Sequence, residues 1–350
     1  MVRFNNGLTV GPDAPIRVNC NVGCNHVSEY KNEKQKLFKL KEEGILPDMM
    51  MDLSLADFAS PLYEIIRDDL GLAFGTVLSY QGFSKSQGLQ WDDLRNRFLN
   101  LCQAGLSFIT IHFTADSDLL YKAKQQRFIP VTSRGGGIVL YDSIQNSRAQ
   151  NLYRKHIDEI ASIALTYDVV ISLGTTFRPG TILDACDDIH IEETRRQLEV
   201  CRILQNQGVK VMVENIGHIS LDKIEKHANL LQQFNAPIMP LGPLPTDTAV
   251  NEDHISNAIG SAYAAYLGVA HVINCVSRYE HSYSKIGVEQ TIEAIRTARV
   301  AAQIANVARG VTESIDKEKM VTTERSKRHC CFADGTACAR CSKVCPLKLI

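Results

Sequence analysis

Three cysteines near the end of the chain have the spacing of a metal or cluster site. Cys338, Cys341 and Cys345 form a C-x-x-C-x-x-x-C motif in CARCSKVC, and Cys330 and Cys331 precede them. A structural zinc site closes with four ligands, whereas an iron–sulfur cluster held by three thiolates leaves one iron open to another ligand. The motif alone leaves both chemistries open, so the rest of the chain must decide between them.

Polar and titratable side chains recur at the ends of the apolar runs of the chain. An isolated buried histidine is usually a hydrogen-bonded core residue, so only the recurrence indicates a site. His218 and His281 would lie at neighbouring strand ends, where two neutral imidazoles suit zinc or ferrous iron if water or substrate completes the coordination. The residues at these ends are Asn21, Met51, Asp52, Tyr80, Gln81, His112, Glu214, His218, Asp247, Glu280 and His281.

Two loops have residues suited to binding an anion. In SRGGG (133–137) the glycines would let backbone N–H groups face an anion beside Arg134, although a plain glycine turn explains the string equally well. In FRPG (177–180), Arg178 would present a guanidinium group on a stiff loop, which suits a phosphate or carboxylate. The alternative for the second loop is an ordinary surface turn.

Eight short apolar runs alternate with longer amphipathic stretches, a pattern typical of β/α units around a parallel sheet. The pattern predicts a (β/α)8 barrel, in which groups at the carboxyl ends of the strands face the active site. No G-x-G-x-x-G follows the first run, which argues against a dinucleotide-binding sheet. The predicted strands cover 16–22, 45–53, 72–80, 107–112, 168–174, 209–215, 236–242 and 268–276.

The barrel is expected to occupy residues 1–285 as the catalytic domain. Helices are predicted over 89–105 and 146–168 within it. Residues 286–350 are expected to form a C-terminal extension, with a long amphipathic helix over 288–310, a polar stretch and the cysteine tail. The tail therefore resembles a tethered appendage that can reach over the mouth of a barrel.

The composition is that of a soluble globular protein. The formal charge of −1 gives no general attraction to nucleic acid or to an anionic membrane, and MVRFNNGLTV lacks the pattern of a secretory signal. The apolar stretch 258–276 is interpreted as a buried helix leading into a strand. Without an export signal, the 11 cysteines indicate a reducing, cytoplasmic location, and Cys102, Cys201 and Cys275 are expected in the core.

Ten short motifs occur in the order and near-spacing of a known family. From about residue 16 to its end the chain resembles the 4-amino-5-hydroxymethyl-2-methylpyrimidine phosphate synthases, the radical S-adenosylmethionine enzymes of thiamin pyrimidine synthesis. The motifs are VNCNVG, MMMDLS, GTVLSYQG, FITIH, SRGGG, RPG, ENIGH, LGPLPTD, DHISNAIG and the cysteine motif.

The resemblance implies a (β/α)8 barrel and a [4Fe–4S] cluster held by Cys338, Cys341 and Cys345. The fourth iron would chelate S-adenosylmethionine, whose reductive cleavage gives a 5′-deoxyadenosyl radical that attacks the ribose of 5-aminoimidazole ribotide. It also implies an electron donor such as flavodoxin or ferredoxin, and a homodimer in which the tail of one protomer serves the barrel of the other.

The same resemblance implies roles for individual barrel residues. His218 and His281 match the histidines that hold a metal, zinc or ferrous iron, beside the cofactor. Glu214, His112 and Arg178 are the expected catalytic residues. The positions that match substrate-binding residues of the family are Asn21, Met51, Tyr80, His112, Ser133, Arg134, Gly135, Arg178 and Glu214.

Several positions depart from the family pattern. Thr175 replaces an acidic residue, Met239 replaces a tyrosine, and Glu252 stands where tyrosine is usual. An altered acid and aromatic beside the substrate, with the cluster and metal groups kept, would suit a changed product. The first prediction is therefore 5-hydroxybenzimidazole synthase, which makes a cobamide lower-ligand precursor from the same ribotide. The alternative prediction is the pyrimidine phosphate synthase.

Three rival interpretations remain open. A zinc-dependent barrel hydrolase would use His218, His281 and an acid such as Glu214 or Asp247, with its tail a zinc knot closed by Cys331 or His329. A second possibility is a member of the same family that keeps its cluster only as a structural element. A third is a chain that is active only with a homologous partner subunit.

Overall fold

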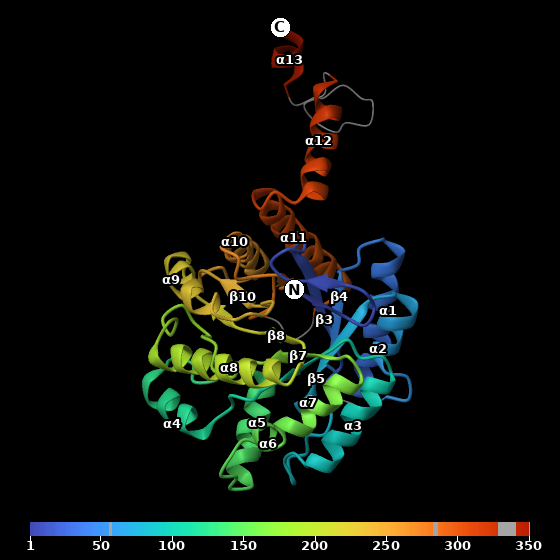
Figure 1. Ribbon diagram of the computed structural model, residues 1–350. Coiled ribbons are helices and arrows are strands. Elements are labelled where there is room, and N and C mark those ends of the chain that lie inside the picture. Colours follow the sequence, from blue (N-terminus) through green and yellow to red (C-terminus); the bar gives the residue numbers. More distant parts are fainter. Residues whose placement is uncertain (56–57, 283–285, 328–340, 350) are drawn as a thin grey trace.

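The computed structural model describes residues 1–55, 58–282, 286–327 and 341–349. Seven parallel strands form one curled sheet in the order β11-β3-β4-β5-β6-β7-β8 (Figure 1). Nearly all of their residues are buried, as expected for strands covered on both faces. The strands are β3 Arg17–Val22, β4 Met49–Asp52, β5 Ala73–Val77, β6 Phe108–Ile111, β7 Val170–Leu173, β8 Val211–Val213 and β11 Val272–Asn274.

The eighth predicted strand closes the ring without forming a regular ladder. The N–H of Val213 donates to the carbonyl of Pro237 and the N–H of Met239 donates to the carbonyl of Val213, each at 2.8 Å. On the other side, the N–H of His271 donates to the carbonyl of Ile238 at 2.8 Å. The segment 237–239 therefore joins β8 to β11, and the predicted eight-unit barrel is confirmed.

Helices surround the strands on the outside of the ring (Figure 1). The predictions over 89–105 and 288–310 are confirmed by α3 and α11. The single helix predicted over 146–168 is wrong, because 146–151 is not helical and His156 separates two helices. The helices are α1 Tyr30–Glu42, α2 Leu62–Glu64, α3 Trp91–Gln103, α4 Ser117–Gln126, α5 Arg134–Gln145, α6 Leu152–Lys155, α7 Ile157–Thr166, α8 Asp188–Asn206, α9 Leu221–Leu231, α10 Asp253–Tyr266 and α11 Val288–Ala308.

A short hairpin covers the N-terminal end of the barrel. Its strands, β1 Val2–Arg3 and β2 Thr9–Val10, are antiparallel. Between them, the ring of Phe4 stacks on Phe108 with 5.6 Å between centroids, and the Asn5 amide donates to the carbonyl of Leu106 at 2.8 Å. These contacts lie where β6 begins, so the opposite end of the barrel, where the strands finish, is left for the site.

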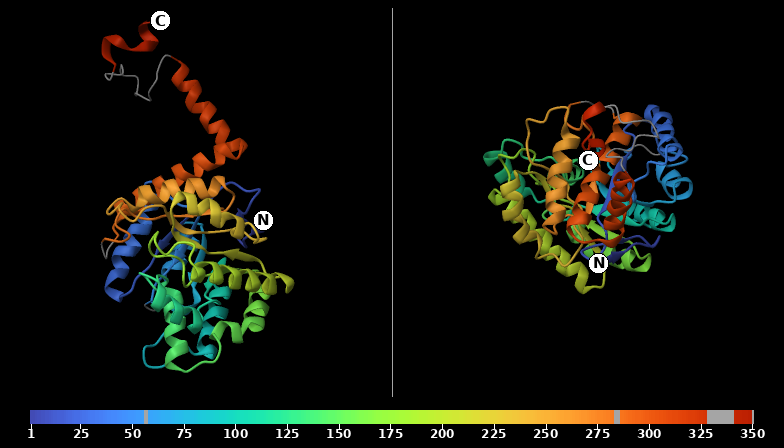
Figure 2. Two further views of the ribbon diagram at one scale, coloured as in Figure 1. Left: turned by 90° about the vertical axis from the view of Figure 1, so that its left-hand side faces the viewer. Right: turned by 90° about the horizontal axis from the view of Figure 1, so that it is seen from above.

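The C-terminal part of the chain begins on the barrel and then leaves it. Helix α11 buries Ala298, Ala301 and Ala305, and Asn306 accepts a buried hydrogen bond of 2.8 Å from the N–H of Ile16. The polar stretch that follows is helical as α12 (Thr312–Ser326), which leads away from the barrel, and α13 (Pro346–Leu349) lies past its far end (Figures 1 and 2). Among the described residues, no helix is long and apolar enough to cross a membrane.

Candidate active site at the carboxyl ends of the strands

One cavity of about 450 Å³ gathers most of the predicted barrel residues. Cys275, which was expected in the core, also lines this cavity, whereas Cys102 and Cys201 are buried as predicted. Of the nine predicted substrate-binding positions, Gly135 alone is outside the lining. The predicted residues in the lining are Asn21, Met51, Tyr80, His112, Ser133, Arg134, Arg178, Glu214, His218, Glu280 and His281.

His112, which follows β6, is held in a narrow slot. A Cβ atom placed on Gly135 would lie 2.4 Å from its Cε1, and one on Gly174 would lie 2.7 Å from its Nε2. Nε2 is 3.0 Å from the hydroxyl of Ser133, while Nδ1 is buried and has no hydrogen-bond partner among the described residues. Burial, assisted by the charge of Arg178, lowers the pKa of His112 to about 3. The ring is therefore neutral, and its buried Nδ1 faces Gly135.

The SRGGG string is the start of helix α5 and not a glycine turn. Ser133 is the N-cap, and its hydroxyl accepts a hydrogen bond of 3.0 Å from the N–H of Gly136. Arg134 lies over the ring of Tyr80 at 4.4 Å and donates to its hydroxyl at 2.9 Å. Within the described residues Arg134 forms no ion pair, so its charge and the helix N-terminus both remain available to an anion.

Arg178 and Glu214 face the cavity from adjacent strand ends. The guanidinium of Arg178 donates to the carbonyl of Thr175 at 3.0 Å, and a Glu214 oxygen accepts from the N–H of Thr175 at 3.2 Å. Burial raises the pKa of Glu214, and the charge of Arg178 opposes this rise. The pair therefore combines a fixed cation with a carboxyl group able to exchange a proton.

The buried Glu193 of α8, which the sequence analysis missed, holds the loop that carries Arg178. Its carboxylate accepts hydrogen bonds from the N–H groups of Thr176 and Phe177 at 2.6 and 2.7 Å, and from the hydroxyl of Thr114 at 2.8 Å. Burial raises its pKa to about 7. The sequence did contain a signal for this residue, because Glu193 lies four positions after Ile189 and therefore falls on the apolar face of the helix.

His218 and His281 meet at the wall of the cavity. His218 ends β9 (Ile216–His218), which pairs with β10 (Leu241–Leu244) beyond the barrel strands. The Nδ1 of His218 is 2.6 Å from Asp247, the Nδ1 of His281 is 3.0 Å from Asp253, and the two Nε2 atoms are 3.3 Å apart. Because each Nδ1–H donates to a carboxylate, both Nε2 lone pairs face the same point.

This donor set fits the metal that the sequence predicts. Two nitrogens bound to one tetrahedral zinc ion at about 2.0–2.1 Å lie about 3.3 Å apart. Burial lowers the pKa of His218, which keeps the imidazole in its metal-binding neutral form. The carboxylates of Asp247 and Asp253 supply the outer hydrogen bonds that orient metal-bound histidines.

The three departures from the family pattern are absent from the described lining, although the backbone of Thr175 hydrogen-bonds to the lining residues Arg178 and Glu214. Thr175 and Met239 are completely buried, and neither belongs to the described lining. Glu252 pairs with Arg278 at 3.2 Å and with His254 at 3.7 Å. The inference that the altered acid and aromatic stand beside the substrate therefore stays a prediction.

Only part of the cysteine tail is described. Cys341 is half-buried and Cys345 is buried, beside the short turn Ser342–Val344. Cys338 lies outside the described residues, as do Cys331 and His329 of the alternative zinc knot. The cluster ligands therefore stay a prediction from the sequence.

Comparisons with known proteins agree with the resemblance. The sequence model of the family described as Radical SAM ThiC matches residues 2–350. The phosphomethylpyrimidine synthase of Thermotoga sp. (strain RQ2) is 33% identical over 334 residues, which is 92% of this chain and 78% of that protein. The enzyme of that name from Sulfurisphaera tokodaii is 35% identical over 312 residues, with 86% and 72% covered.

A solved structure was also found. The dihydropteroate synthase of Coxiella burnetii, in complex with pteroic acid, aligns with 87% of this chain and 99% of its own at a TM-score of 0.47 and 11% identity. Similarity at this level supports no inference about function.

Proposed function

Because this chain belongs to the radical SAM ThiC family, we propose that it is a phosphomethylpyrimidine synthase, which converts 5-aminoimidazole ribotide to the pyrimidine phosphate of thiamin synthesis. The relatives reported above are named phosphomethylpyrimidine synthase, which was the alternative prediction. They are not named 5-hydroxybenzimidazole synthase, which was predicted first. The side chains of Thr175 and Met239 are absent from the described lining of the cavity, which weakens the argument for a changed product. The pyrimidine synthase is therefore the better-supported function.

The observation that carries this proposal is the convergence of complementary groups on one cavity of about 450 Å³. Arg134 and the N-terminus of α5 suit the phosphate of the ribotide. The neutral ring of His112 and the hydroxyl-bearing Ser133 line the same cavity, and Arg178 can hold a second polar group. Glu214, with its raised pKa, can take up or release a proton during the rearrangement.

The cofactors fit the remaining donors of the chain. When bound, a [4Fe–4S] cluster and S-adenosylmethionine supply the radical chemistry that removes hydrogen from the ribotide. Cys338, Cys341 and Cys345 would hold the cluster, and His218 and His281 would hold the barrel metal. The carboxylates of Asp247 and Asp253 hold the imidazoles of His218 and His281 in place, so both rings face the cavity without a bound ion.

We further propose that the tail acts on the barrel of a second copy of the chain. Helix α12 carries Cys341 and Cys345 away from the body that contains their own cavity (Figure 2). A second hollow of about 510 Å³ shares Asn21, Leu53 and Arg134 with the cavity and would receive the partner's tail.

Mixed dimers test this arrangement. A Cys341→Ala chain and an Arg178→Ala chain should each be inactive alone. Equilibrated together, they should regain activity, because one mixed site combines an intact tail with an intact barrel. Mixed dimers that form, as seen by native mass spectrometry, but stay inactive would show that each tail serves its own barrel.

The assay for the function itself is direct. The protein is purified without oxygen, reconstituted with iron and sulfide, and supplied with S-adenosylmethionine, a reductant and 5-aminoimidazole ribotide, and the products are analysed by mass spectrometry. We expect 5′-deoxyadenosine together with the pyrimidine phosphate. A benzimidazole product would support the first prediction, 5-hydroxybenzimidazole synthase. If a protein with an intact cluster forms neither product, a required partner subunit is indicated.

A further inference from the structure

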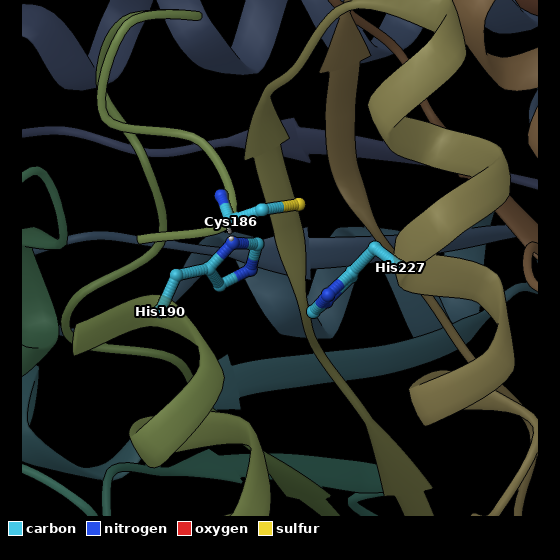
Figure 3. Close-up of side chains that lie close together, drawn as sticks. All are labelled: Cys186, His190 and His227. Atoms are coloured by element: carbon cyan, nitrogen blue, oxygen red, sulfur yellow. Dashed lines mark hydrogen bonds between the residues drawn. The ribbon is translucent and has the colours of Figure 1, made fainter. Parts of the chain in front are cut away.

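A second group of metal-ligating side chains lies on the outer side of the barrel, away from the cavity. Cys186 precedes α8, His190 lies in the first turn of α8, and His227 lies in α9. Figure 3 shows the three side chains converging from these segments. One ligand atom from each lies within 4.8 Å of the others. None of the three belongs to the lining of the barrel cavity.

Hydrogen bonds fix the protonation of both imidazoles. Its amide nitrogen donates to Thr194 at 3.3 Å and to Gln197 at 2.8 Å, so its oxygen must be the acceptor on the other side. That oxygen is 3.0 Å from the Nε2 of His227 and 3.4 Å from the Nε2 of His190. The same oxygen accepts the N–H of Ile216 at 2.6 Å, so the Nε2–H of His227 takes its second lone pair. The tautomer of His190 follows from the N–H of Cys186, which points at its Nδ1. Both Nδ1 atoms therefore carry lone pairs.

These lone pairs lack adequate partners. Within the part of the chain that the structure describes, the Nδ1 of His227, which is 2% exposed, has no hydrogen-bond partner. The Nδ1 of the fully buried His190 receives one long contact there, 3.3 Å from the N–H of Cys186. A buried acceptor left unpaired is costly. Burial also keeps the pKa of both rings below its ordinary value, so both imidazoles stay neutral.

Cys186 adds a sulfur donor that is half-buried. Lys223 lies beside it and donates to the carbonyls of Ile182 and Ala185 at 3.2 and 3.0 Å, which fixes the segment before Cys186. Burial raises the pKa of the thiol and the Lys223 ammonium opposes this rise. A metal ion bound at this position would deprotonate the sulfur outright.

We propose that Cys186, His190 and His227 bind a Zn²⁺ ion, in a site separate from the barrel metal. One thiolate and two neutral imidazoles are donors that zinc prefers, and three protein ligands leave a fourth position for water. The ligand atoms need to approach one another by about 1 Å to reach tetrahedral zinc distances, an adjustment within reach of side-chain rotation.

The ion would fasten the segment before α8 to α9. Asn215, the outer partner of both histidines, directly follows the cavity residue Glu214, so the site would also steady one wall of the cavity. This proposal does not rest on the proposed function. It holds or fails whatever reaction the barrel catalyses.

Cobalt substitution tests the site in the full-length chain. The parent protein for the test carries alanine at every tail cysteine, so that a thiolate–cobalt charge-transfer band can come only from the rest of the chain. We expect this band and visible tetrahedral d–d bands on adding Co²⁺, with loss of both on adding Zn²⁺. The replaced residues are Cys330, Cys331, Cys338, Cys341 and Cys345.

Substitutions in that parent identify the ligands. Cys186→Ser should abolish the charge-transfer band and reduce the zinc-dependent rise in Tm to the part due to the barrel metal, and His227→Phe should do the same. Asn215→Ala, which removes an outer partner, should weaken zinc binding by about 10–100-fold. Cys201→Ala is the matched control, because Cys201 is buried on α8 outside the cluster, and it should leave the band unchanged.

Two results would overturn the proposal. One is a parent protein that shows no charge-transfer band with Co²⁺. The other is a Cys186→Ser variant, folded by circular dichroism, that keeps both the band and the zinc affinity of its parent. Cys186→Ser is a mild change at a half-buried loop position, so folding should not obscure the result.

Discussion

The imidazole of His112 lies against Gly135 so closely that a Cβ atom on the glycine would stand 2.4 Å from Cε1 of the ring. Gly135 was predicted to bind substrate, yet it is absent from the described lining of the cavity. Its close contact with His112 shows that the missing side chain leaves room for the His112 ring, which lines the cavity, and its role in substrate binding stays a prediction. The glycines of SRGGG therefore differ in function although they are adjacent in sequence.

A methyl group at Gly135 should displace His112 from the cavity. We expect Gly135→Ala to lower the free energy of unfolding by about 1–3 kcal/mol through overpacking and to reduce kcat/KM at least tenfold. Urea denaturation and the product assay measure the two effects. Gly137→Ala is the matched control, because nothing lies within 4 Å of its Cβ position, and it should stabilise the helix by about 0.5–1 kcal/mol.

His218→Ala should remove the barrel metal without affecting the tail cluster. The Nε2 pair at 3.3 Å cannot act as a chelate once one ring is lost. Asp253→Asn, which weakens the support of His281, should lower metal affinity by about 10–100-fold. Metal analysis by mass spectrometry, with iron and sulfide counted separately, gives both values. An unchanged metal content in His218→Ala would refute the assignment.

Cys341→Ala should abolish the cluster. Two remaining thiolates do not hold a [4Fe–4S] unit, so the visible absorbance of the reconstituted protein and its cleavage of S-adenosylmethionine should both disappear. Cys102→Ala, at a buried position of α3, serves as the control and should keep both. If Cys341→Ala still cleaves S-adenosylmethionine at the rate of the parent, the assignment of Cys341 as a cluster ligand is wrong.

Glu193 should make stability depend on pH in a defined direction. Its pKa is raised by burial from 4.5 to about 7, so between these values the folded state binds more protons than the unfolded state. The contribution of this group to the free energy of unfolding therefore falls as pH rises from 4.5 to 7 and is constant above that range.

Glu193→Gln tests this dependence. The difference in unfolding free energy between parent and variant should decrease across pH 4.5–7, as measured by urea denaturation at several pH values. The variant should also lose kcat/KM, since the loop that holds Arg178 is anchored through Glu193. Glu192→Gln, at the half-buried neighbour, should leave both properties near those of the parent. Parallel stability curves for parent and Glu193→Gln would contradict the raised pKa.

The strand ends could be located from sequence because apolar runs mark buried parallel strands, and parallel strands finish at one edge. The same reasoning predicted a regular strand over the whole apolar run 236–242, which the structure does not contain. Pro237 and Pro240 have no N–H to donate, and the N–H of Ile238 donates to the ring of His271 at 2.9 Å, so too few groups remain for a ladder.

The groups that sequence reasoning missed are those joined across helices. Cys186 and His190 are four residues apart, which is a weak signal of one helix face, but His227 comes from the next β/α unit. No periodicity connects residues of two helices, because their contact depends on how the helices pack. The N-terminal hairpin was missed for a simpler reason, since each of its strands has only two residues.

The hairpin that covers the N-terminal end of the barrel also determines how the protein can be handled. Met1 is 71% exposed and stands at the end opposite the cavity, whereas the other terminus carries the cysteine motif. A purification tag, fluorophore or surface attached before Met1 would leave the mouth of the barrel and the tail free. A tag next to the cysteine motif would instead lie beside the predicted cluster ligands, so immobilised assays should use the Met1 side.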